Sequence, residues 1–158
     1  MENLTHRIGG LEKQVDTGNV SYDPANHQEM VRLRAEKVAK VADFIPEQSL
    51  EGDKDGDVLI VSWGGTYGAT HQAVHKLRAQ GKKVGLMHMQ YLNPMPKNTE
   101  SILKSYKKII VCELNCGQLK NLLNSTYNVG AIAYNKVQGQ PFKIRELVQM
   151  VEKELENK

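Results

Sequence analysis

The spacing of hydrophobic residues along this chain changes at about residue 57. Upstream, one stretch carries apolar residues at helical spacing, whereas downstream short β-branched runs alternate with further helical patterns. The polar, turn-rich segment EGDKDGD (51–57) separates the two patterns. We therefore predict two parts: residues 1–56 as an N-terminal arm, helix and linker, and residues 57–158 as a globular α/β domain.

The N-terminal part is predicted to contain one helix. Residues 1–22 are rich in Gly, Asn and Thr and show neither helical nor strand spacing, so they predict an extended arm. Asp23 suits the helix start because its carboxylate can accept an early N–H, and Pro24 fits the first helical position. The helix is predicted to end before Pro46. Its apolar face is formed by Met30, Val31, Val38, Val41, Ala42 and Ile45.

The second part alternates strands and helices. Its predicted strands are DVLIVSW (57–63), KVGLMHM (83–89), KKIIVCEL (107–114) and AIAY (131–134). The first run is apolar almost throughout, which predicts burial on both faces. Helices are predicted from the turn after it to about Gln80, from a cap at Asn98, over 117–127, and from Pro141 onward. This alternation predicts a mostly parallel sheet with helices on both faces, a three-layer α/β fold.

Composition excludes several classes of function. The 158 residues carry 21 basic and 18 acidic side chains, a net charge of +3 without a Lys/Arg stripe, so we expect no nucleic acid partner. No apolar run approaches the ~20 residues that span a bilayer, so we expect no membrane partner. The N-terminus has no apolar stretch typical of a secretion signal, and only two cysteines are present. These features favour a cytoplasmic protein.

A glycine-rich turn follows the first predicted strand and contains Gly64, Gly65, Thr66 and Tyr67, followed by Gly68. Glycines allow a tight turn and a close approach to the backbone, and the N–H groups of a helix start can hold a phosphate or carboxylate. The turn matches neither GxGxxG nor the P-loop pattern. A ligand-binding turn and a plain tight turn with Thr66 as a helix cap therefore both stay open.

Amide side chains gather in or just beyond the predicted strand ends: Asn93, Asn115, Gln118 and Asn135. Because the carboxyl ends of parallel strands meet at one edge of a sheet, where ligands commonly bind, we expect these residues at one edge. They could contact a polar partner, or they could hold their own loops, since Asn readily hydrogen-bonds turn backbone. Both interpretations stay open.

Two pairs of possible metal ligands favour ordinary roles. His71 and His75 lie in HQAVH, which lacks the glutamate of HExxH and any evident third ligand, so we expect two histidines on a helix surface. Cys112 falls in a buried strand and Cys116 at a helix start, where a thiolate would be favoured. Two sulfurs are too few for a cluster. We predict no catalytic, cofactor-binding or metal-binding residue.

Four motifs at strand ends carry a resemblance to a known family. WGGTYGA, YLNPMPKN, ELNCGQL and NKVQGQPF occur in order and closely resemble the C-terminal region of 2-oxoacid:ferredoxin oxidoreductase α subunits, the 2-oxoglutarate type in particular. GGLEKQ followed by SYDPANHQEMVRLRAEK resembles the stretch upstream of that domain. The resemblance covers residues 8–155 and implies a Rossmann-like fold similar to the C-terminal domain of transketolase.

The resemblance also implies a function. Enzymes of this family decarboxylate a 2-oxoacid on thiamine diphosphate with Mg²⁺, pass electrons through an iron–sulfur cluster to ferredoxin, and release an acyl-CoA. The implied partners are a β subunit and the N-terminal α domain that would precede this segment. The chain offers no ligands for those cofactors, so we expect a role in assembly and in shaping the active site. The residues expected at that interface are Gly64, Gly65, Thr66, Tyr67, Asn93, Asn115 and Gln118.

Two departures from the family and two alternative functions remain. Lys13-Gln14 stands where family members tend to carry His-Asp, and Gly65 stands where they often carry Ser. The first departure puts contacts of the arm in doubt, and the second weakens direct ligand binding by the turn. One alternative is a stand-alone module that binds a small anion at the glycine turn. The other is the equivalent domain of a transketolase or a pyruvate dehydrogenase β chain.

Overall fold

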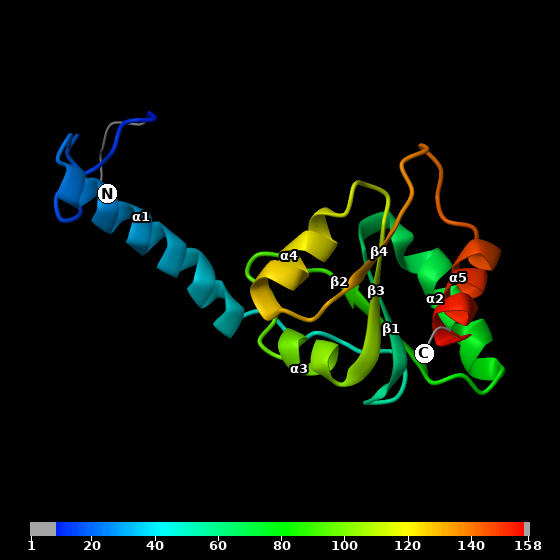
Figure 1. Ribbon diagram of the computed structural model, residues 1–158. Helices are drawn as coiled ribbons and strands as arrows, with labels where there is room; N and C mark the ends of the chain where they lie inside the picture. Colours follow the sequence, from blue (N-terminus) through cyan, green and yellow to red (C-terminus); the bar gives the residue numbers. More distant parts are fainter. Residues whose placement is uncertain (1–8, 157–158) are drawn as a thin grey trace. The chain divides into compact units, whose positions relative to one another are not determined.

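The computed structural model describes residues 9–156 and is shown in Figure 1. The chain divides into two compact units, Met1–Ile45 and Pro46–Lys158. Residues 46–56, which the sequence pattern assigns to the N-terminal arm, helix and linker, fall in the second unit.

The first unit is built around helix α1 (Pro24–Ala39), which continues into the 3₁₀ helix η1 (Lys40–Asp43). The Asp23 carboxylate accepts a hydrogen bond from the N–H of Ala25 at 3.0 Å, so the predicted N-cap is confirmed. Pro24 occupies the first turn, where its missing N–H costs nothing.

The arm is not extended over residues 12–21, because this stretch closes into a short loop. Lys13 and Val20 form an antiparallel bridge. The N–H of Gln14 donates to the carbonyl of Asn19 at 2.7 Å, which closes the turn between them. A single bridge needs no alternation of apolar and polar residues, so the sequence of residues 12–21 gave no sign of it.

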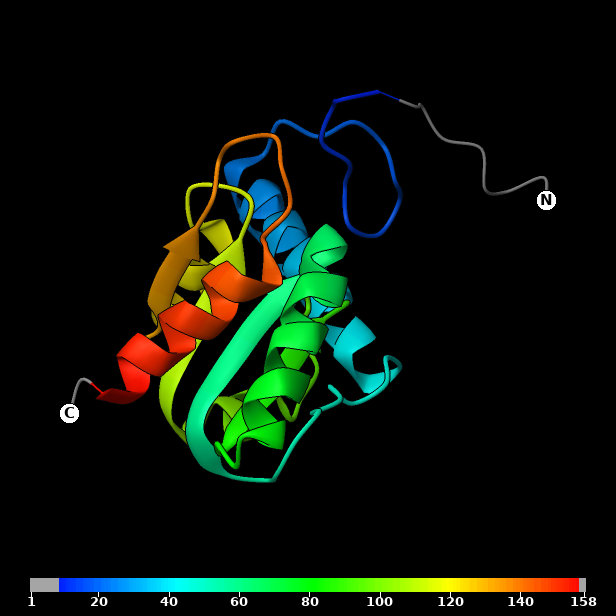
Figure 2. The same ribbon diagram turned by 90° about the vertical axis from the view of Figure 1, so that its right-hand side faces the viewer.

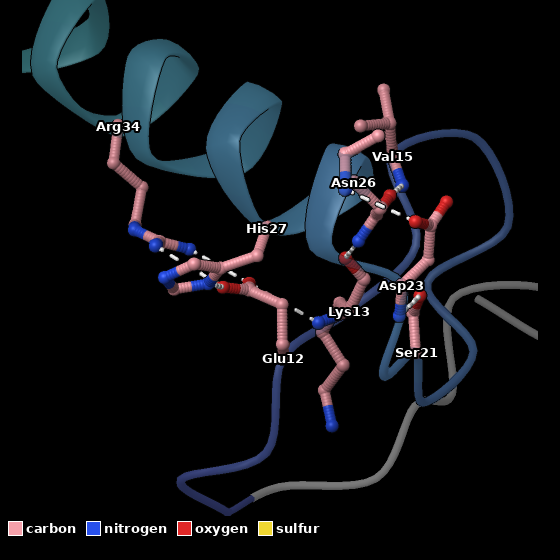
Figure 3. A network of polar contacts seen from close by, with 9 residues as sticks. Glu12, Lys13, Val15, Ser21, Asp23, Asn26, His27 and Arg34 are labelled. Atoms are coloured by element: carbon pink, nitrogen blue, oxygen red, sulfur yellow. Dashed lines mark hydrogen bonds and ion pairs between the residues drawn. The ribbon is translucent and has the colours of Figure 1, made fainter.

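Side chains of α1 fasten this loop (Figure 3). Asn26 donates to the carbonyl of Lys13 at 2.8 Å, and its side-chain oxygen accepts the N–H of Val15 at 3.0 Å. Glu12 pairs with Arg34 at 2.9 Å and with the Nδ1 of His27 at 2.6 Å. Arg34 first, and His27 second, lower the pKa of Glu12 to about 2. The arm therefore keeps ordered contacts through Glu12 and Asn26 although Lys13-Gln14 departs from the family pattern.

The second unit contains a four-stranded, wholly parallel sheet in the order β2-β1-β3-β4. Its strands are β1 (Gly56–Trp63), β2 (Val84–Met89), β3 (Tyr106–Glu113) and β4 (Ile132–Asn135). Its helices are α2 (Tyr67–Ala79), α3 (Thr99–Lys104), α4 (Gln118–Tyr127) and α5 (Ile144–Glu156), and the 3₁₀ turn η2 (Gly64–Thr66) precedes α2. The predicted α/β class and parallel sheet are confirmed.

Helices cover both faces of this sheet, as the continuous apolar strands predicted. Figure 1 shows α3 and α4 on one face and α2 and α5 on the other, and Figure 2 shows α2 and α5 in front of β1. Side chains of β1 alternate between the two cores: Val58 and Ile60 pack with α2 and α5, whereas Leu59 and Val61 pack with α3 and α4. All four side chains are fully buried.

The strand order places a topological switch point between β1 and β3. From β1 the chain moves outward to β2 on one side, then returns to β3 on the other side and continues to β4. Connections that leave adjacent strands in opposite directions open a crevice at their carboxyl ends, where ligands of such sheets bind. A site is therefore expected at the carboxyl ends of β1 and β3.

The segment before β1 covers the outer edge of β2. Glu51 exchanges both backbone hydrogen bonds with Leu86, at 2.9 and 2.8 Å. Asn98 stands at the N-cap position of α3, but its amide does not cap that helix. It bonds instead to the backbone of Gln48, donating to the carbonyl at 2.9 Å and accepting the N–H at 2.8 Å. The prediction that Asn98 caps a helix was wrong because a more distant segment uses its side chain.

The last helix begins at Ile144 and not at Pro141, where it was predicted. Phe142 is buried and its ring stacks on Tyr134 with centroids 5.4 Å apart, which holds this stretch against β4 in a non-helical path. The Glu146 carboxylate then accepts the N–H of Lys143 at 3.1 Å, as a residue in the first helical turn often does.

Across residues 9–156, the structure contains no helix with both the length and the apolar character needed to cross a membrane.

Candidate functional site

Each strand of the second unit is followed or ended by an exposed apolar side chain. Trp63 ends β1, and Tyr91, Leu114 and Val137 follow β2, β3 and β4. These four side chains are between 36% and 65% exposed. We call the side of the sheet that they share the carboxyl edge. Tyr67, 42% exposed at the start of α2, belongs to the same edge.

The opposite side of the sheet has a different chemistry. Asp57 pairs with Lys107 at 2.8 Å, and Asp53 pairs with Arg78 at 3.0 Å. Hydrogen bonding to Lys107 lowers the pKa of Asp57, so both partners stay charged. The only other large apolar side chains exposed within residues 46–156 are Leu122 and Ile132, on α4 and β4. Exposed apolar area thus gathers mainly at the carboxyl edge.

A hollow of about 250 Å³ lies at this edge, at the switch point between β1 and β3. We call it the Trp63 hollow; its lining residues are Trp63, Gly64, Gly65, Thr66, Leu114 and Asn115. None of these side chains is ionisable. Gly64 has φ +59°, a conformation that favours glycine, whereas a Cβ added to Gly65 would meet no atom within 4 Å. Gly65 therefore leaves open space in the hollow that a partner can occupy.

A buried carboxylate lies next to the hollow. Glu113, the last residue of β3, is fully buried. Its Oε2 accepts the N–H of Leu119 at 2.9 Å and the indole N–H of Trp63 at 3.4 Å, and its Oε1 accepts the N–H of Lys120 at 2.9 Å. The positive end of the α4 dipole favours a carboxylate at this position. Glu113 thereby links the wall of the hollow to the first turn of α4.

Asn115 satisfies the remaining groups at the start of α4. Its Oδ1 accepts the N–H of Gly117 at 2.7 Å and the N–H of Gln118 at 3.2 Å. Gly117 has φ +94°, and a Cβ there would come within 3.0 Å of the Asn135 side chain, so this position favours glycine. With Glu113 bound to the next two N–H groups, all four early donors of α4 are paired internally. They are not available to a phosphate or carboxylate ligand.

The structure brings four of the seven predicted interface residues together. Gly64, Gly65, Thr66 and Asn115 line the Trp63 hollow, and Tyr67, Asn93 and Gln118 do not. The Thr66 hydroxyl donates to the Trp63 carbonyl at 2.7 Å and accepts the Trp63 N–H at 3.2 Å. It therefore closes the glycine turn and makes no side-chain cap on α2.

The other three residues lie around the hollow in different settings. Asn93 is exposed in the segment after β2, and Gln118 is exposed at the start of α4. Tyr67 reaches away from the hollow: its hydroxyl donates to Glu51 at 3.0 Å, and its ring lies 4.9 Å from the ring of His88. The hydrogen bond to Glu51, with burial, raises the pKa of Tyr67.

Sequence reasoning missed the polar network that Tyr67 enters. The Glu51 carboxylate also lies 2.6 Å from the Nδ1 of His71. Glu51 therefore connects the segment before β1 to helix α2. Behind it, the Ser62 hydroxyl lies 2.8 Å from the Nδ1 of His88. Glu51 bonds to His71 and Tyr67 and not to His88, so these residues do not form a Ser–His–acid relay. Ser62 and His88 lie near the ends of two predicted strands, but only the register of β1 and β2 places them side by side.

We expect His88 to make the second unit less stable in mild acid. Burial lowers the pKa of His88 from its ordinary value of 6.5, and the nearby Glu51 opposes this only in part. The neutral ring is therefore favoured in the folded state, and its contribution is present above pH 6.5 and is lost as the pH falls below that value. Urea unfolding at pH 7.5 and at pH 5.5 should show a smaller drop for His88→Gln than for the unmodified chain. An equal drop in both proteins would contradict the assignment.

The described residues do not fit the cofactors of the implied holoenzyme. Between residues 9 and 156, no three or more His, Cys, Asp or Glu side chains gather to hold a metal ion. Cys112 is fully buried in β3, and burial raises the pKa of its thiol, whereas Cys116 is exposed. The Trp63 hollow offers no charged side chain to a diphosphate.

Comparison with known proteins identifies the class to which this fold and this edge belong. Residues 56–147 match the family model described as pyruvate:ferredoxin oxidoreductase core domain II. The chain belongs to that family. The α subunit resemblance found in the strand-end motifs is thereby confirmed at the level of the domain.

Individual relatives are more specific. The chain is 39% identical over 145 residues to the 2-oxoglutarate oxidoreductase subunit KorA of Mycobacterium tuberculosis, covering 91% of this chain and 22% of that relative. It also superposes on the solved 2-oxoglutarate:ferredoxin oxidoreductase of Magnetococcus marinus with a TM-score of 0.88 and 35% identity, covering 96% of this chain and 27% of the solved one. The chain thus spans only about a fifth to a quarter of these relatives.

A more distant likeness concerns the fold alone. A split-gene transketolase superposes with a TM-score of 0.51 at 18% identity, covering 69% of this chain and 42% of that one. The predicted transketolase-like architecture of the second unit is confirmed by this match. The match says nothing of a shared activity.

Proposed function

We propose that this chain is the C-terminal part of an α subunit of a 2-oxoglutarate:ferredoxin oxidoreductase, in which it serves assembly and shapes the active site. The whole enzyme would oxidatively decarboxylate a 2-oxoacid and release an acyl-CoA. Thiamine diphosphate, Mg²⁺, an iron–sulfur cluster and CoA would be held by other parts of the complex. The proposed partners are the N-terminal α domain and the β subunit, with ferredoxin as the electron acceptor of the complex.

One observation carries this proposal: the likeness to enzymes named for 2-oxoglutarate extends over both units of the chain. The M. tuberculosis relative covers 91% of the chain and the M. marinus structure covers 96%, beyond the 56–147 stretch of the family model. The M. marinus structure contains 2-oxoglutarate, coenzyme A and succinyl-CoA. This supports 2-oxoglutarate as the 2-oxoacid, whereas the family model by itself names pyruvate.

We propose further that the carboxyl edge of the sheet faces the N-terminal α domain or the β subunit. The exposed aromatic side chains Trp63, Tyr67 and Tyr91 support this role, because aromatic residues are enriched at interfaces. The stand-alone anion-binding module has less support, since the early N–H groups of α4 are already paired with Glu113 and Asn115.

The isolated chain is expected to show no oxidoreductase activity. Reduction of a viologen dye with 2-oxoglutarate and CoA should require the remaining α polypeptide and the β subunit in addition to this chain. Thiamine diphosphate with Mg²⁺ should leave the melting temperature of the isolated chain unchanged. Turnover by the pure chain, or stabilisation by several degrees, would show that a cofactor site has been overlooked. A complex that uses pyruvate and ignores 2-oxoglutarate would contradict the substrate.

Assembly should respond differently to Gln118→Ala and Tyr67→Ala. The Gln118 side chain is exposed, so its removal should weaken assembly of the α subunit on its partners without lowering the melting temperature. Tyr67 bonds to Glu51 and packs on His88, so its removal should both weaken assembly and lower the melting temperature. Melting of the free α subunit and gel filtration with the β subunit measure the two effects. Normal assembly of folded Gln118→Ala would remove Gln118 from the interface.

A further inference from the structure

The Trp63 hollow has the features of a docking point for a protein side chain and not those of a ligand site. Its volume of about 250 Å³ falls below the range of about 300–1,000 Å³ typical of small-molecule pockets. Its lining is uncharged, and the one carboxylate beside it, Glu113, is buried and bound to three N–H groups. A charged occupant would lose hydration without gaining an oppositely charged partner.

Exposed apolar side chains follow the outer strands on both sides of the hollow. Trp63 and Leu114 form its walls, and Tyr91 and Val137 lie at the ends of the two outer strands. A concave point with exposed apolar side chains on either side is an arrangement expected where a protruding side chain of a partner is buried at the centre of an interface. The spread of these side chains over all four strand ends favours a folded domain over a short peptide as the partner.

We infer that the Trp63 hollow receives an apolar, uncharged side chain of the remaining α polypeptide, and that Glu113 positions Trp63 to form its wall. This inference rests on the proposed function and names which of its two possible partners covers the carboxyl edge. The matched region is about a fifth of the M. tuberculosis relative and about a quarter of the M. marinus chain, so most of each of those polypeptides lies outside it. A domain joined through the same polypeptide is the partner present at the highest effective concentration.

Glu113 is a positioning residue in this arrangement. Its Oε2 holds the indole N–H of Trp63 at 3.4 Å, and both of its oxygens are fixed by the first turn of α4. The indole is therefore held by β3 and α4 at once, although Trp63 itself belongs to β1. A wall fixed in this way loses little conformational freedom when a side chain docks against it.

The single tryptophan of the chain makes the test direct. Because Trp63 is the only tryptophan, the chain grown with fluorotryptophan gives one fluorine NMR resonance, located in the hollow. The unlabelled remaining α polypeptide bound to the β subunit is added in one titration, and the β subunit alone in another. The inference expects the resonance to shift or broaden in the first titration only.

Two variants separate the hollow from the rest of the surface. Gly65→Leu fills the hollow, where a Cβ meets no atom within 4 Å, and Gln80→Leu adds the same side chain at the far end of α2 as a matched control. Both should melt close to the unmodified chain. Gly65→Leu should weaken binding of the α polypeptide by about tenfold or more, and Gln80→Leu should not.

The outcomes distinguish the inference from the proposed function. A resonance that moves with the β subunit alone, or with the concentration of this chain alone, assigns the hollow to another partner and overturns the inference. Binding that leaves the resonance unmoved, or that Gly65→Leu does not weaken, overturns it as well. In each of these cases an active reconstituted complex would leave the proposed function standing. Failure to reconstitute any 2-oxoacid oxidation would instead remove the proposed function.

Discussion

Gly85→Ala is expected to destabilise the second unit by about 3 kcal/mol, a large effect for adding one methyl group. Gly85 lies in β2, and the ring of Tyr106, from the start of β3, packs directly over it. A Cβ on Gly85 would come within 2.7 Å of the Tyr106 Cζ and into direct overlap with its hydroxyl oxygen. Tyr106 has little room to move, since it is 7% exposed and its hydroxyl donates to the Asp53 carbonyl at 2.5 Å.

The clash predicts strong coupling between the two positions. In a Tyr106→Leu background, Gly85→Ala should cost less than about 1 kcal/mol, because the ring that it collides with is gone. Gly68→Ala is the matched control: a Cβ on Gly68 meets no atom within 4 Å, and alanine favours the helix by up to about 1 kcal/mol. Urea unfolding of the unmodified chain, Gly85→Ala, Tyr106→Leu, the double variant and Gly68→Ala measures these differences. Equal costs of Gly85→Ala in both backgrounds would contradict the contact.

The contact between Tyr106 and Gly85 also shows what sequence patterns leave out. Glycine in a strand often marks the close approach of another group, so VGLMHM carried a signal that something lies over Gly85. It did not name Tyr106, because the two residues are brought together only by the strand order, with β1 between β2 and β3. The same ring also covers Gly56, where a Cβ would come within 2.6 Å of Tyr106 Cε1.

Local signals predicted most of the fold. The alternation of Val58 to Val61 between two cores follows from the strand period alone, and the cap at Asp23 follows from the residue that precedes Pro24. Asn98 failed as a predicted cap because Gln48, fifty residues away, takes its amide. A local pattern shows that Asn98 can cap a helix, but it does not show that the folded chain brings the Gln48 backbone within reach of the same amide.

The candidate site was predictable as an edge but not as a hollow. Parallel strands predicted that residues after β1 and β3 meet, and Gly64, Gly65, Thr66 and Asn115 do line one hollow. Its walls, Trp63 and Leu114, were overlooked because single exposed apolar residues in a sequence carry no pattern. Glu113 did carry a signal, because it directly follows the apolar run IIVC. A glutamate in such a place is seldom buried unless hydrogen-bond donors surround its carboxylate. Those donors are the first N–H groups of the helix that follows.

Glu113→Gln is expected to lower the free energy of unfolding by about 2–3 kcal/mol, although the two side chains have the same shape. Glu113 uses both oxygens as acceptors, Oε1 for Lys120 and Oε2 for Leu119 and Trp63. Glutamine replaces one of these acceptors with a donor. Whichever way its amide is turned, at least one backbone N–H of α4 then faces an N–H group in a fully buried position.

Trp63→Phe separates the role of Glu113 in the fold from its role at the hollow. This variant removes the long indole bond at 3.4 Å and part of the ring of a side chain that is already 36% exposed, and it leaves both backbone bonds to α4, so it should cost less than about 1 kcal/mol. Urea unfolding followed by circular dichroism measures both variants, and the fluorescence of Trp63 reports the hollow in Glu113→Gln. If Glu113→Gln costs no more than Trp63→Phe, the carboxylate does not hold the start of α4. If it costs the expected amount and the Trp63 emission moves toward that of a solvent-exposed indole, one buried carboxylate fixes both the helix and the wall of the hollow.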